Sequence, residues 1–531
     1  MIKKFWYKLQ TTVAGGAIII SSATVISKIF GLIRDRLLFS TFGAGNETDI
    51  YFAAFKLPDL IFNILVLGAL SAAFIPVFIQ FRNESSEGSE HWQIANTIMN
   101  IVVALMIGLG LIAFLAAPIL VDWIAPGFDQ GKQAETIILT RIMLLAIVFF
   151  GVSNVLSGIL NALRRYVAYS LAPILYNAGI IIGIVVFYPK MGLAGLAWGV
   201  VLGAFLHMII QIPSTIKSGY KYKWKINLQN SGVKKIGRLF APRMLGLAVN
   251  QINFLVITII ATTLAVGSLS VFNAANNLQS FPISVFGVSL AIAVFPLMSQ
   301  AYVDRDSEKF IVQFSVAVRR VLYLIIPVSV LILLLRAQIV RVVLGAGAFD
   351  WEDTVLTAQA LGLFSISLFA QSLLPTLSRA FYALQDTITP VKISALSVFL
   401  NIILSIILVK PMGVLGLALA FSISAIFNMM IHLVIMRRKV GYLDDRKIMG
   451  SVTRIIFASI VAGGITWLSL RLIAMGVNMQ TFVGIAIQGA LAAIIGAIAY
   501  IIISLIFRFD EVKILRSWLD KIISPLRNGK P

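Results

Sequence analysis

The 531-residue sequence predicts an all-α integral membrane protein of about 14 transmembrane helices, with two six-helix lobes around a central cavity and two further helices after them. Three observations predict this fold: the composition, the spacing of apolar segments, and an internal repeat. Hydrophobic residues make up 59% of the chain and charged residues only 12%, whereas a soluble domain carries about a quarter charged residues. The mean hydropathy is +0.96. Such a chain requires a bilayer as its solvent.

Apolar segments long enough to cross a bilayer recur along the whole chain. A hydrocarbon core about 30 Å thick needs roughly 20 apolar residues per helix. Because the stretch from Met244 to Val303 contains no Lys, Arg, Asp or Glu, it must contain two spans, and we expect their turn at residues 266–270. Charged residues, prolines and glycines punctuate the rest of the chain. Together they predict spans near residues 14–40, 50–81, 94–121, 137–163, 168–188, 192–214, 240–264, 270–301, 314–342, 355–385, 388–409, 413–436, 452–474 and 480–507.

Basic residues predict the orientation of these helices, because cytoplasmic loops carry an excess of Lys and Arg. An even number of spans and a cytoplasmic amino terminus leave little positive charge outside beyond Lys132, Lys190 and Lys410. Both termini are therefore expected in the cytoplasm. The basic clusters then lie inside, at residues 3–8, 164–165, 217–235, 319–320 and 437–439.

An internal repeat at an offset of about 221 residues is the third observation. Because the repeat contains an even number of helices, its two copies share one orientation, and an axis along the membrane normal should relate them. Two lobes related in this way are typical of transporters. The repeated segments include Phe128-Asp129 with Phe349-Asp350, Ala162-Leu163 with Ala383-Leu384, and Met191-Gly192 with Met412-Gly413.

The repeat and the basic clusters predict how the chain is divided. The tail after the last span alternates apolar and basic residues at helical spacing, which predicts an amphipathic helix on the cytoplasmic leaflet. The expected parts are a first six-helix lobe in residues 1–215, a cytoplasmic basic loop in 216–237, a second six-helix lobe in 238–437, two additional transmembrane helices in 438–507, and a cytoplasmic amphipathic tail in 508–531.

The composition excludes several classes of function. The chain has no cysteine, which excludes disulfides, thiolate metal sites and thiol nucleophiles. The three histidines, His91, His207 and His432, lie far apart without the spacing of metal ligands, so no metal is expected. The net charge of +21 is dispersed over short loops, which favours contact with anionic membrane lipids over nucleic acid. No catalytic motif is present, so neither enzyme activity nor a cofactor is expected.

Ionisable residues within membrane spans are costly unless they face water or a partner, so they mark functional positions. The first two spans carry Lys28, Arg34, Asp35, Asp49 and Lys56. A cationic cluster facing a cavity suits an anionic substrate, because arginine binds phosphate oxygens through two parallel hydrogen bonds. The alternative is that Arg34 and Asp35 lie near the membrane edge and pair with each other.

Two further candidates lie in the second lobe. Arg243 opens the seventh span, where it either faces the cavity or extends to the cytoplasmic interface. Asn277 belongs to a set of neutral polar residues, for which hydrogen bonding between helices is the alternative to a role in binding.

Several ordered motifs are similar to those of a known family. The run from Ser27 to Asp35, the Phe42-Gly43-Ala44-Gly45 segment and the Ala54-Phe55-Lys56-Leu57-Pro58 segment resemble the amino-terminal signature of the MurJ (MviN) family of bacterial lipid II flippases. Phe281-Pro282 and the run from Arg379 to Asp386 resemble later parts of it. The likeness extends from about residue 20 to about residue 505, and implies membership of the multidrug/oligosaccharidyl-lipid/polysaccharide exporter superfamily.

The resemblance implies a function, a partner and a location. Members of this family move lipid II, the undecaprenyl-diphosphate-linked peptidoglycan precursor, from the inner to the outer leaflet of the bacterial plasma membrane by alternating access, for cell-wall synthesis. A monomer is expected, because the two lobes are fused in one chain. In the family, cationic residues of the first, second and eighth helices contact the diphosphate. Arg34 and Asp35 match the first-helix motif, and Lys28 replaces an arginine.

The chain also departs from the family pattern. Neutral Asn63 and Asn277 stand near positions where the resemblance implies arginine, and Lys56 or Arg243 could supply the missing charge. The alternatives are an exporter of another polyprenyl-linked glycan or of an amphipathic compound, and, in a different class, a transport-inactive scaffold of the cell envelope. The full set of expected substrate-binding residues is Lys28, Arg34, Asp35, Asp49, Lys56, Asn63, Arg243 and Asn277.

Overall fold

The computed structural model describes residues 13–67, 69–84 and 90–512. These residues form two compact units. Unit 1 contains the chain up to Ser270 together with Ala346–Phe349, and unit 2 contains Val271–Gly345 and the chain from Asp350 onward. The amphipathic helix predicted for the tail falls on residues 513–531, outside the described residues.

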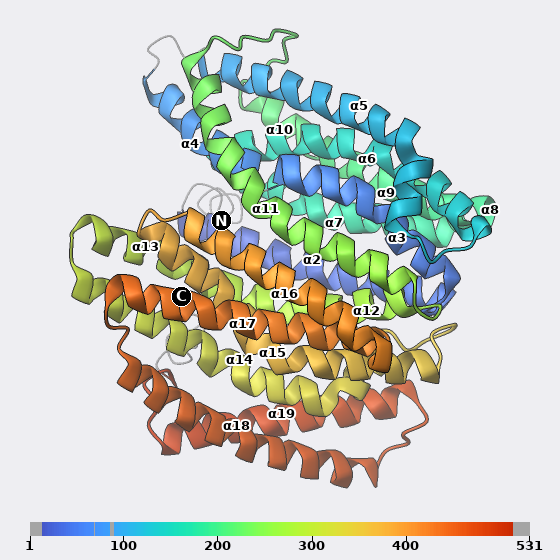
Figure 1. Cartoon of the computed structure of the whole chain (residues 1–531), viewed down its shortest axis with the longest axis vertical. Coiled ribbons are helices and arrows are strands. Elements are labelled where there is room, and N and C mark those ends of the chain that lie inside the picture. Colours follow the sequence, from blue (N-terminus) through green and yellow to red (C-terminus); the bar gives the residue numbers. More distant parts are fainter. Residues whose placement is uncertain (1–12, 68, 85–89, 513–531) are drawn as a thin grey trace, which may run out of the picture. The chain divides into compact units, whose positions relative to one another are not determined.

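Unit 1 is built mainly from long helices, and residues 218–230 form a longer connection between α10 and α11 (Figure 1). Two segments within it, η1 and η2, are π-helical. Its elements are α2 (Val13–Phe42), α3 (Asn46–Phe62), η1 (Asn63–Leu67), α4 (Ala69–Glu84), α5 (Glu90–Ile124), α6 (Gln130–Ala162), α7 (Tyr166–Ile182), η2 (Gly183–Phe187), α8 (Tyr188–Met191), α9 (Leu193–Ile209), α10 (Ile212–Lys217) and α11 (Ser231–Thr262).

Unit 2 repeats this construction and adds two helices, α18 and α19, which pack against each other and against α14 (Figure 1). The first three residues of α12 still belong to unit 1. The elements are α12 (Ser268–Pro282), η3 (Ile283–Val288), α13 (Ser289–Val303), α14 (Ser307–Val343), α15 (Trp351–Ala383), α16 (Ile388–Met412), α17 (Val414–Val440), α18 (Asp445–Ala474) and α19 (Phe482–Ile506).

In the part of the chain that the structure describes, every span predicted from the sequence lies on one helix or on consecutive helical segments, such as α9 and α10 for residues 192–214. Among the described residues, 11 helices are long and apolar enough to cross a membrane. The other predicted spans lie on α2, on the α3–α4 segment and on α11, whose apolar part is Gly246–Thr262. The turn expected at residues 266–270 overlaps the observed connection between α11 and α12, residues 263–267, only at 266–267, because α12 already begins at Ser268. The predicted all-α membrane fold is therefore confirmed.

The internal repeat recurs in the local backbone. Asp129 precedes α6 and accepts a hydrogen bond from the backbone N–H three residues later, and Asp350 does the same at the start of α15. Such caps satisfy backbone donors that the first turn of a helix leaves free. Gly192 and Gly413 precede α9 and α17 with φ of +61° and +54°, a region that favours glycine. The same residue types thus begin corresponding helices in both copies.

Each unit has its own hydrophobic core. The core of unit 1 includes Phe74, Phe78 and Ile147, and that of unit 2 includes Phe314 and Phe381. Helix α11 packs against α3, α4 and α5, so it belongs to unit 1 by its contacts. The predicted lobe boundaries rest on the sequence repeat, and they remain a prediction.

Candidate functional site

A polar cluster lies where α2, α3 and α7 of unit 1 meet, and it contains three of the residues expected to bind substrate. We call the residues Lys28, Arg34, Asp35 and Asn177 the α2 cluster. Successive turns of α2 place Ser27, Gly31 and Arg34 on the side of the helix that packs against α7. A Cβ atom on Gly31 would lie 3.9 Å from the Asn177 Oδ1 atom, so the glycine lets this amide approach α2.

Arg34 is oriented by two side chains. Its Nε and Nη2 atoms donate to Asp35 Oδ1 at 2.9 and 2.7 Å, and its Nη1 atom donates to Asn177 Oδ1 at 3.1 Å. These contacts use three of the five N–H groups of the guanidinium. The Arg34 side chain remains 23% exposed, against 9% for Asp35. The pairing of Arg34 with Asp35, an alternative that the sequence left open, is thus present. Arg34 still has N–H donors that could bind an anion.

Asn177 is oriented in turn by the backbone around it. It is buried, and its Nδ2 atom donates to the Pro173 carbonyl oxygen at 3.0 Å and to the Ser27 carbonyl oxygen at 3.3 Å. These bonds determine which end of the amide faces Arg34, because the donor end is occupied and the acceptor end is left for the guanidinium. Asn177 therefore links α7 to α2 and limits the rotation of Arg34.

The α2 cluster carries a net positive charge. Lys28 is half-buried and interacts electrostatically with both Arg34 and Asp35. Two cations therefore share one carboxylate. The phenol groups of Tyr51 on α3 and Tyr176 on α7 also lie within electrostatic range of Arg34. Two cations and neutral hydrogen-bonding groups in one place can bind an anion such as a phosphate.

Lys56 lies on the next helix, with a different environment. Its Nζ atom is 5.9 Å from the centre of the Phe254 ring on α11, a distance at which the cation is attracted to the ring face. It also interacts electrostatically with Asp59, one turn further along α3. Part of its charge is therefore compensated within α3.

The Asp49 carboxylate is bound by groups of the protein itself. Its carboxylate accepts hydrogen bonds from the Gly267 N–H at 2.7 Å, the Ser270 N–H at 2.9 Å and the Ser270 hydroxyl at 2.6 Å. The side chain is buried. A carboxylate at the start of a helix stabilises the first turn through its free N–H groups and the helix dipole. Asp49 therefore caps the first turn of α12, and a contact with substrate stays a prediction.

The remaining predicted residues are separated from this cluster in the chain. Asn63 is half-buried at the start of the π-helical segment η1. Arg243 lies on α11, and its side chain is outside the described part of the structure. Asn277 lies on α12 in unit 2, where its carbonyl oxygen accepts a hydrogen bond from the Ser280 hydroxyl at 2.7 Å. The structure thus brings together Lys28, Arg34 and Asp35.

Sequence reasoning missed Asn177 and the two tyrosines. Asn177 is the one amide in the apolar helix α7, and an isolated amide in a membrane span needs a partner. That signal was available, but it could not identify Arg34 as the partner, because 143 residues separate the two positions.

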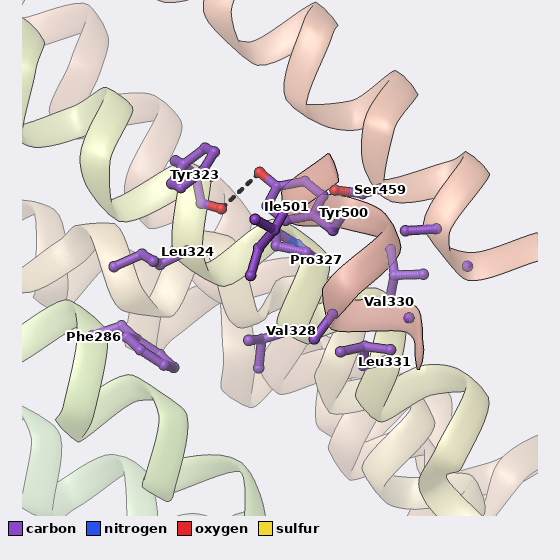
Figure 2. Close-up of a pocket in the computed structure, with 14 residues that line it drawn as sticks. Phe286, Tyr323, Leu324, Pro327, Val328, Val330, Leu331, Ser459, Tyr500 and Ile501 are labelled. Atoms are coloured by element: carbon purple, nitrogen blue, oxygen red, sulfur yellow. Dashed lines mark hydrogen bonds between the residues drawn. The ribbon is translucent and has the colours of Figure 1, made fainter. Parts of the chain in front are cut away.

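Unit 2 contains an apolar pocket of about 150 Å³ between η3, α14, α18 and α19 (Figure 2). Phe286, Pro327 and Ile501 point into it, and the Tyr500 hydroxyl donates to the Tyr323 carbonyl oxygen at 2.8 Å at one end. Its lining is almost entirely apolar, which suits a hydrocarbon group.

Comparisons with known proteins agree with these features. A family model described as "Lipid II flippase MurJ" matches residues 38–487. A probable lipid II flippase MurJ of Vibrio cholerae is 28% identical over 497 residues, which cover 90% of this chain and 95% of the relative. A probable lipid II flippase MurJ of Buchnera aphidicola is 31% identical over 409 residues, covering 76% of this chain and 79% of the relative.

Solved structures show the same fold. A lipid II flippase MurJ in an inward closed conformation matches with a TM-score of 0.77 and 26% identity, covering 93% of this chain and 100% of that chain. An inward-facing multidrug resistance MATE family transporter of the MOP superfamily matches with a TM-score of 0.65 and 16% identity, covering 81% of this chain and 99% of that chain. The second likeness concerns the fold alone. The first confirms the resemblance seen in the sequence.

Proposed function

Because the chain belongs to the lipid II flippase MurJ family, we propose that it moves lipid II from the inner to the outer leaflet of the bacterial plasma membrane for cell-wall synthesis. The family is one of transporters and not of enzymes, and the chain is a multi-pass membrane protein. The proposed reaction is a relocation of the intact lipid, in which no covalent bond is made or broken and no cofactor takes part.

The α2 cluster is the observation that carries the proposal. A diphosphate presents several anionic oxygens, and a guanidinium can donate to two of them at once. Arg34 retains N–H donors beyond those bound to Asp35 and Asn177, and Lys28 adds a second positive charge. We propose that these two cations contact the diphosphate of lipid II, with Asp35 and Asn177 as the groups that orient Arg34.

Asp35 also limits how tightly the substrate binds. A buried cation without a partner is costly, so the carboxylate stabilises Arg34 in the absence of substrate. The same carboxylate competes with the diphosphate for the guanidinium. A transporter requires this balance, because a substrate that binds too tightly cannot leave on the other side.

The repeat supports a mechanism of alternating access, in which the two lobes open to each side of the membrane in turn. We propose that the chain acts as a monomer with both termini in the cytoplasm, and that the basic loops on that side contact anionic lipids. Lys56 and Arg243 remain candidates to supply charge that Asn63 and Asn277 lack. The division into lobes at residues 1–215 and 238–437, followed by two helices in 438–507, is part of this proposal.

Asn63 and Asn277 also favour a second candidate, an exporter of another polyprenyl-linked glycan. With two neutral amides in place of cations, the protein would bind a diphosphate less tightly, and contacts with the sugar would contribute more to recognition. The two candidates differ in their substrate and not in their fold.

The test is growth of a bacterium depleted of its own lipid II flippase. The unaltered gene is compared with Arg34→Ala and Lys28→Ala versions, and membrane levels of each protein are measured. Arg141→Ala is the matched control, because Arg141 bonds the Phe114 carbonyl oxygen and lies 5.0 Å from that residue's ring, away from the α2 cluster. Appearance of lipid II at the outer surface is measured by its cleavage with an enzyme added from outside.

The outcomes separate the hypotheses. We expect growth and surface lipid II with the unaltered gene and with Arg141→Ala, and a loss of both with Arg34→Ala at equal membrane levels. If Arg34→Ala moves lipid II as fast as the unaltered protein, the α2 cluster does not bind the diphosphate. If the abundant unaltered protein moves no lipid II but moves another polyprenyl-linked glycan in the same cells, the second candidate is correct.

A further inference from the structure

A segment of unusual composition, without helix or strand, joins α10 to α11 in unit 1. Residues 220–228, which we call the lysine–aromatic segment, alternate basic and large apolar side chains. The lysines are Lys221, Lys223 and Lys225, and between them stand Tyr222 and Trp224. A hydrogen bond from the Lys225 N–H to the Lys223 carbonyl oxygen at 2.9 Å closes a tight turn centred on Trp224, so the lysines and the aromatic rings do not divide onto two opposite sides of the segment.

Two buried asparagines on α5 bind the backbone of this segment. Asn96 donates from Nδ2 to the Lys221 carbonyl oxygen at 3.1 Å and accepts from the Lys223 N–H at 2.8 Å. One turn further, the Asn100 Nδ2 atom donates to the Lys223 and Lys225 carbonyl oxygens, each at 3.1 Å. These contacts use the backbone only, so the lysine side chains take no part in fixing the segment.

Tyrosine hydroxyls complete the attachment. The Tyr220 hydroxyl donates to Asn96 Oδ1 at 3.0 Å, and the Tyr222 hydroxyl donates to Asn100 Oδ1 at 2.8 Å. Burial raises the pKa of Tyr220, so its hydroxyl stays protonated and remains a donor. The segment is therefore fixed along the first turns of α5, while its outward side chains remain accessible.

The outward side chains are both basic and apolar. All three lysines are exposed, and the Trp224 side chain is 73% exposed. Tyr222, Ile226 and Leu228 are exposed as well. Large exposed apolar groups beside lysines are typical of the boundary between a membrane and water, where an aromatic ring enters the headgroup layer and a lysine meets lipid phosphate.

Helix α5 shows at what depth the segment lies. The exposed apolar side chains of α5 begin at Leu105 and end at Trp123, about 27 Å apart at 1.5 Å per residue, which matches a hydrocarbon core of about 30 Å. Asn100 lies about 8 Å before this belt and Asn96 about 14 Å before it. Headgroup regions add roughly 5–8 Å on each side. Lys223 and Lys225, bound at Asn100, are therefore at the level of lipid headgroups.

We propose that the lysine–aromatic segment is a binding surface for anionic phospholipid headgroups, with Trp224 in the headgroup layer, Lys223 and Lys225 facing lipid phosphate at that level, and Lys221, one turn of α5 further out, extending its long side chain toward it. The proposal rests on the proposed contact with anionic lipids and names the segment that makes it, and it is independent of which lipid is transported. A cytoplasmic protein as the partner is less favoured, because the segment lies at headgroup depth beside the apolar belt of α5.

The test uses the full-length protein in nanodiscs made of phosphatidylglycerol and phosphatidylcholine. In one sample the phosphatidylglycerol carries bromines near the top of its acyl chains, and in the other the phosphatidylcholine does. The chain has 8 tryptophans, so the signal of Trp224 is taken as the difference between the unaltered protein and Trp224→Phe. Quenching by bromine reports which lipid lies next to Trp224.

Three variants define the cause. Lys221→Gln/Lys223→Gln/Lys225→Gln removes the charges, and Lys190→Gln/Lys410→Gln removes exposed charges elsewhere as a control. Asn96→Ala/Asn100→Ala keeps the three lysines but removes the bonds that fix them, so it separates positioning from charge.

At low salt we expect brominated phosphatidylglycerol to quench Trp224 more strongly than brominated phosphatidylcholine. This preference should fall roughly fivefold for each lysine removed and vanish in high salt, with no change in the control. Equal quenching by both lipids at low salt would overturn the proposal. Quenching of Trp224 by iodide in water with none from either brominated lipid would also overturn it, and would identify the segment as a surface for a soluble partner.

Discussion

Removing the carboxylate of Asp49 should destabilise unit 1 by a calculable amount. The carboxylate accepts bonds from the Gly267 N–H, the Ser270 N–H and the Ser270 hydroxyl. A buried donor left without a partner costs roughly 1–3 kcal/mol. Asp49→Ala leaves two such N–H groups, so we expect the free energy of unfolding to fall by about 4 kcal/mol. Asp49→Asn keeps one acceptor oxygen and should cost about half as much.

The assay is unfolding by SDS titrated into mixed micelles, followed by circular dichroism. Ser270→Ala removes only the hydroxyl bond, and we expect it to cost about 1.5 kcal/mol. Combined with Asp49→Ala it should cost less than the sum, because both changes remove the same bond. If Asp49→Ala unfolds like the unaltered protein but abolishes transport, the cap is wrong and Asp49 contacts substrate, as the sequence alone suggested.

Three further predictions follow from single sites. Glu511→Ala should lower the free energy of unfolding by about 1–3 kcal/mol, because it leaves the half-buried Arg319 without the carboxylate 2.6 Å away, and a thermal melt in detergent would show it. Gly267→Ala should lower the melting temperature far more than Gly192→Ala. Both glycines have positive φ, but of the two only Gly267 would place its new Cβ 2.0 Å from a carbonyl oxygen. Equal shifts in melting temperature would refute this steric argument. Burial alone would raise the pKa of Asp386, but hydrogen bonds from Lys439 and Thr389 lower it to about 2. The ionised carboxylate therefore contributes fully to stability above about pH 4, and this contribution is lost as the pH falls toward 2. A series of thermal melts at different pH values tests this prediction.

The candidate site was predicted in part. Lys28, Arg34 and Asp35 were recognisable because charges within an apolar helix are costly, and they lie within two turns of one another. Their partner Asn177 was not, because an amide in a distant helix can bond any group that packing brings near it. The hydrogen-bond partners of Asp49 were not predictable for the same reason, since they lie more than 200 residues away, and its contact with substrate stays a prediction.

The lysine–aromatic segment illustrates the difference between composition and arrangement. Its lysines were visible in the sequence as part of a basic loop, and the expected contact with anionic lipid followed from their charge. The sequence carried no signal that Asn96 and Asn100 would bind the backbone of this loop, because more than 120 residues separate them from it. The depth of the segment relative to the apolar belt of α5 became known only from those contacts.

The sequence by itself determined the all-α membrane fold, the approximate positions of the spans, the repeat, and the residue types that begin corresponding helices in both copies. These properties are local: a span needs about 20 apolar residues, and a cap needs one side chain beside its own helix. The tertiary structure decided which polar groups meet, including Arg34 with Asn177 and Asp49 with Ser270. A buried polar group must find a partner, and only the packing of helices distant in the chain selects which one.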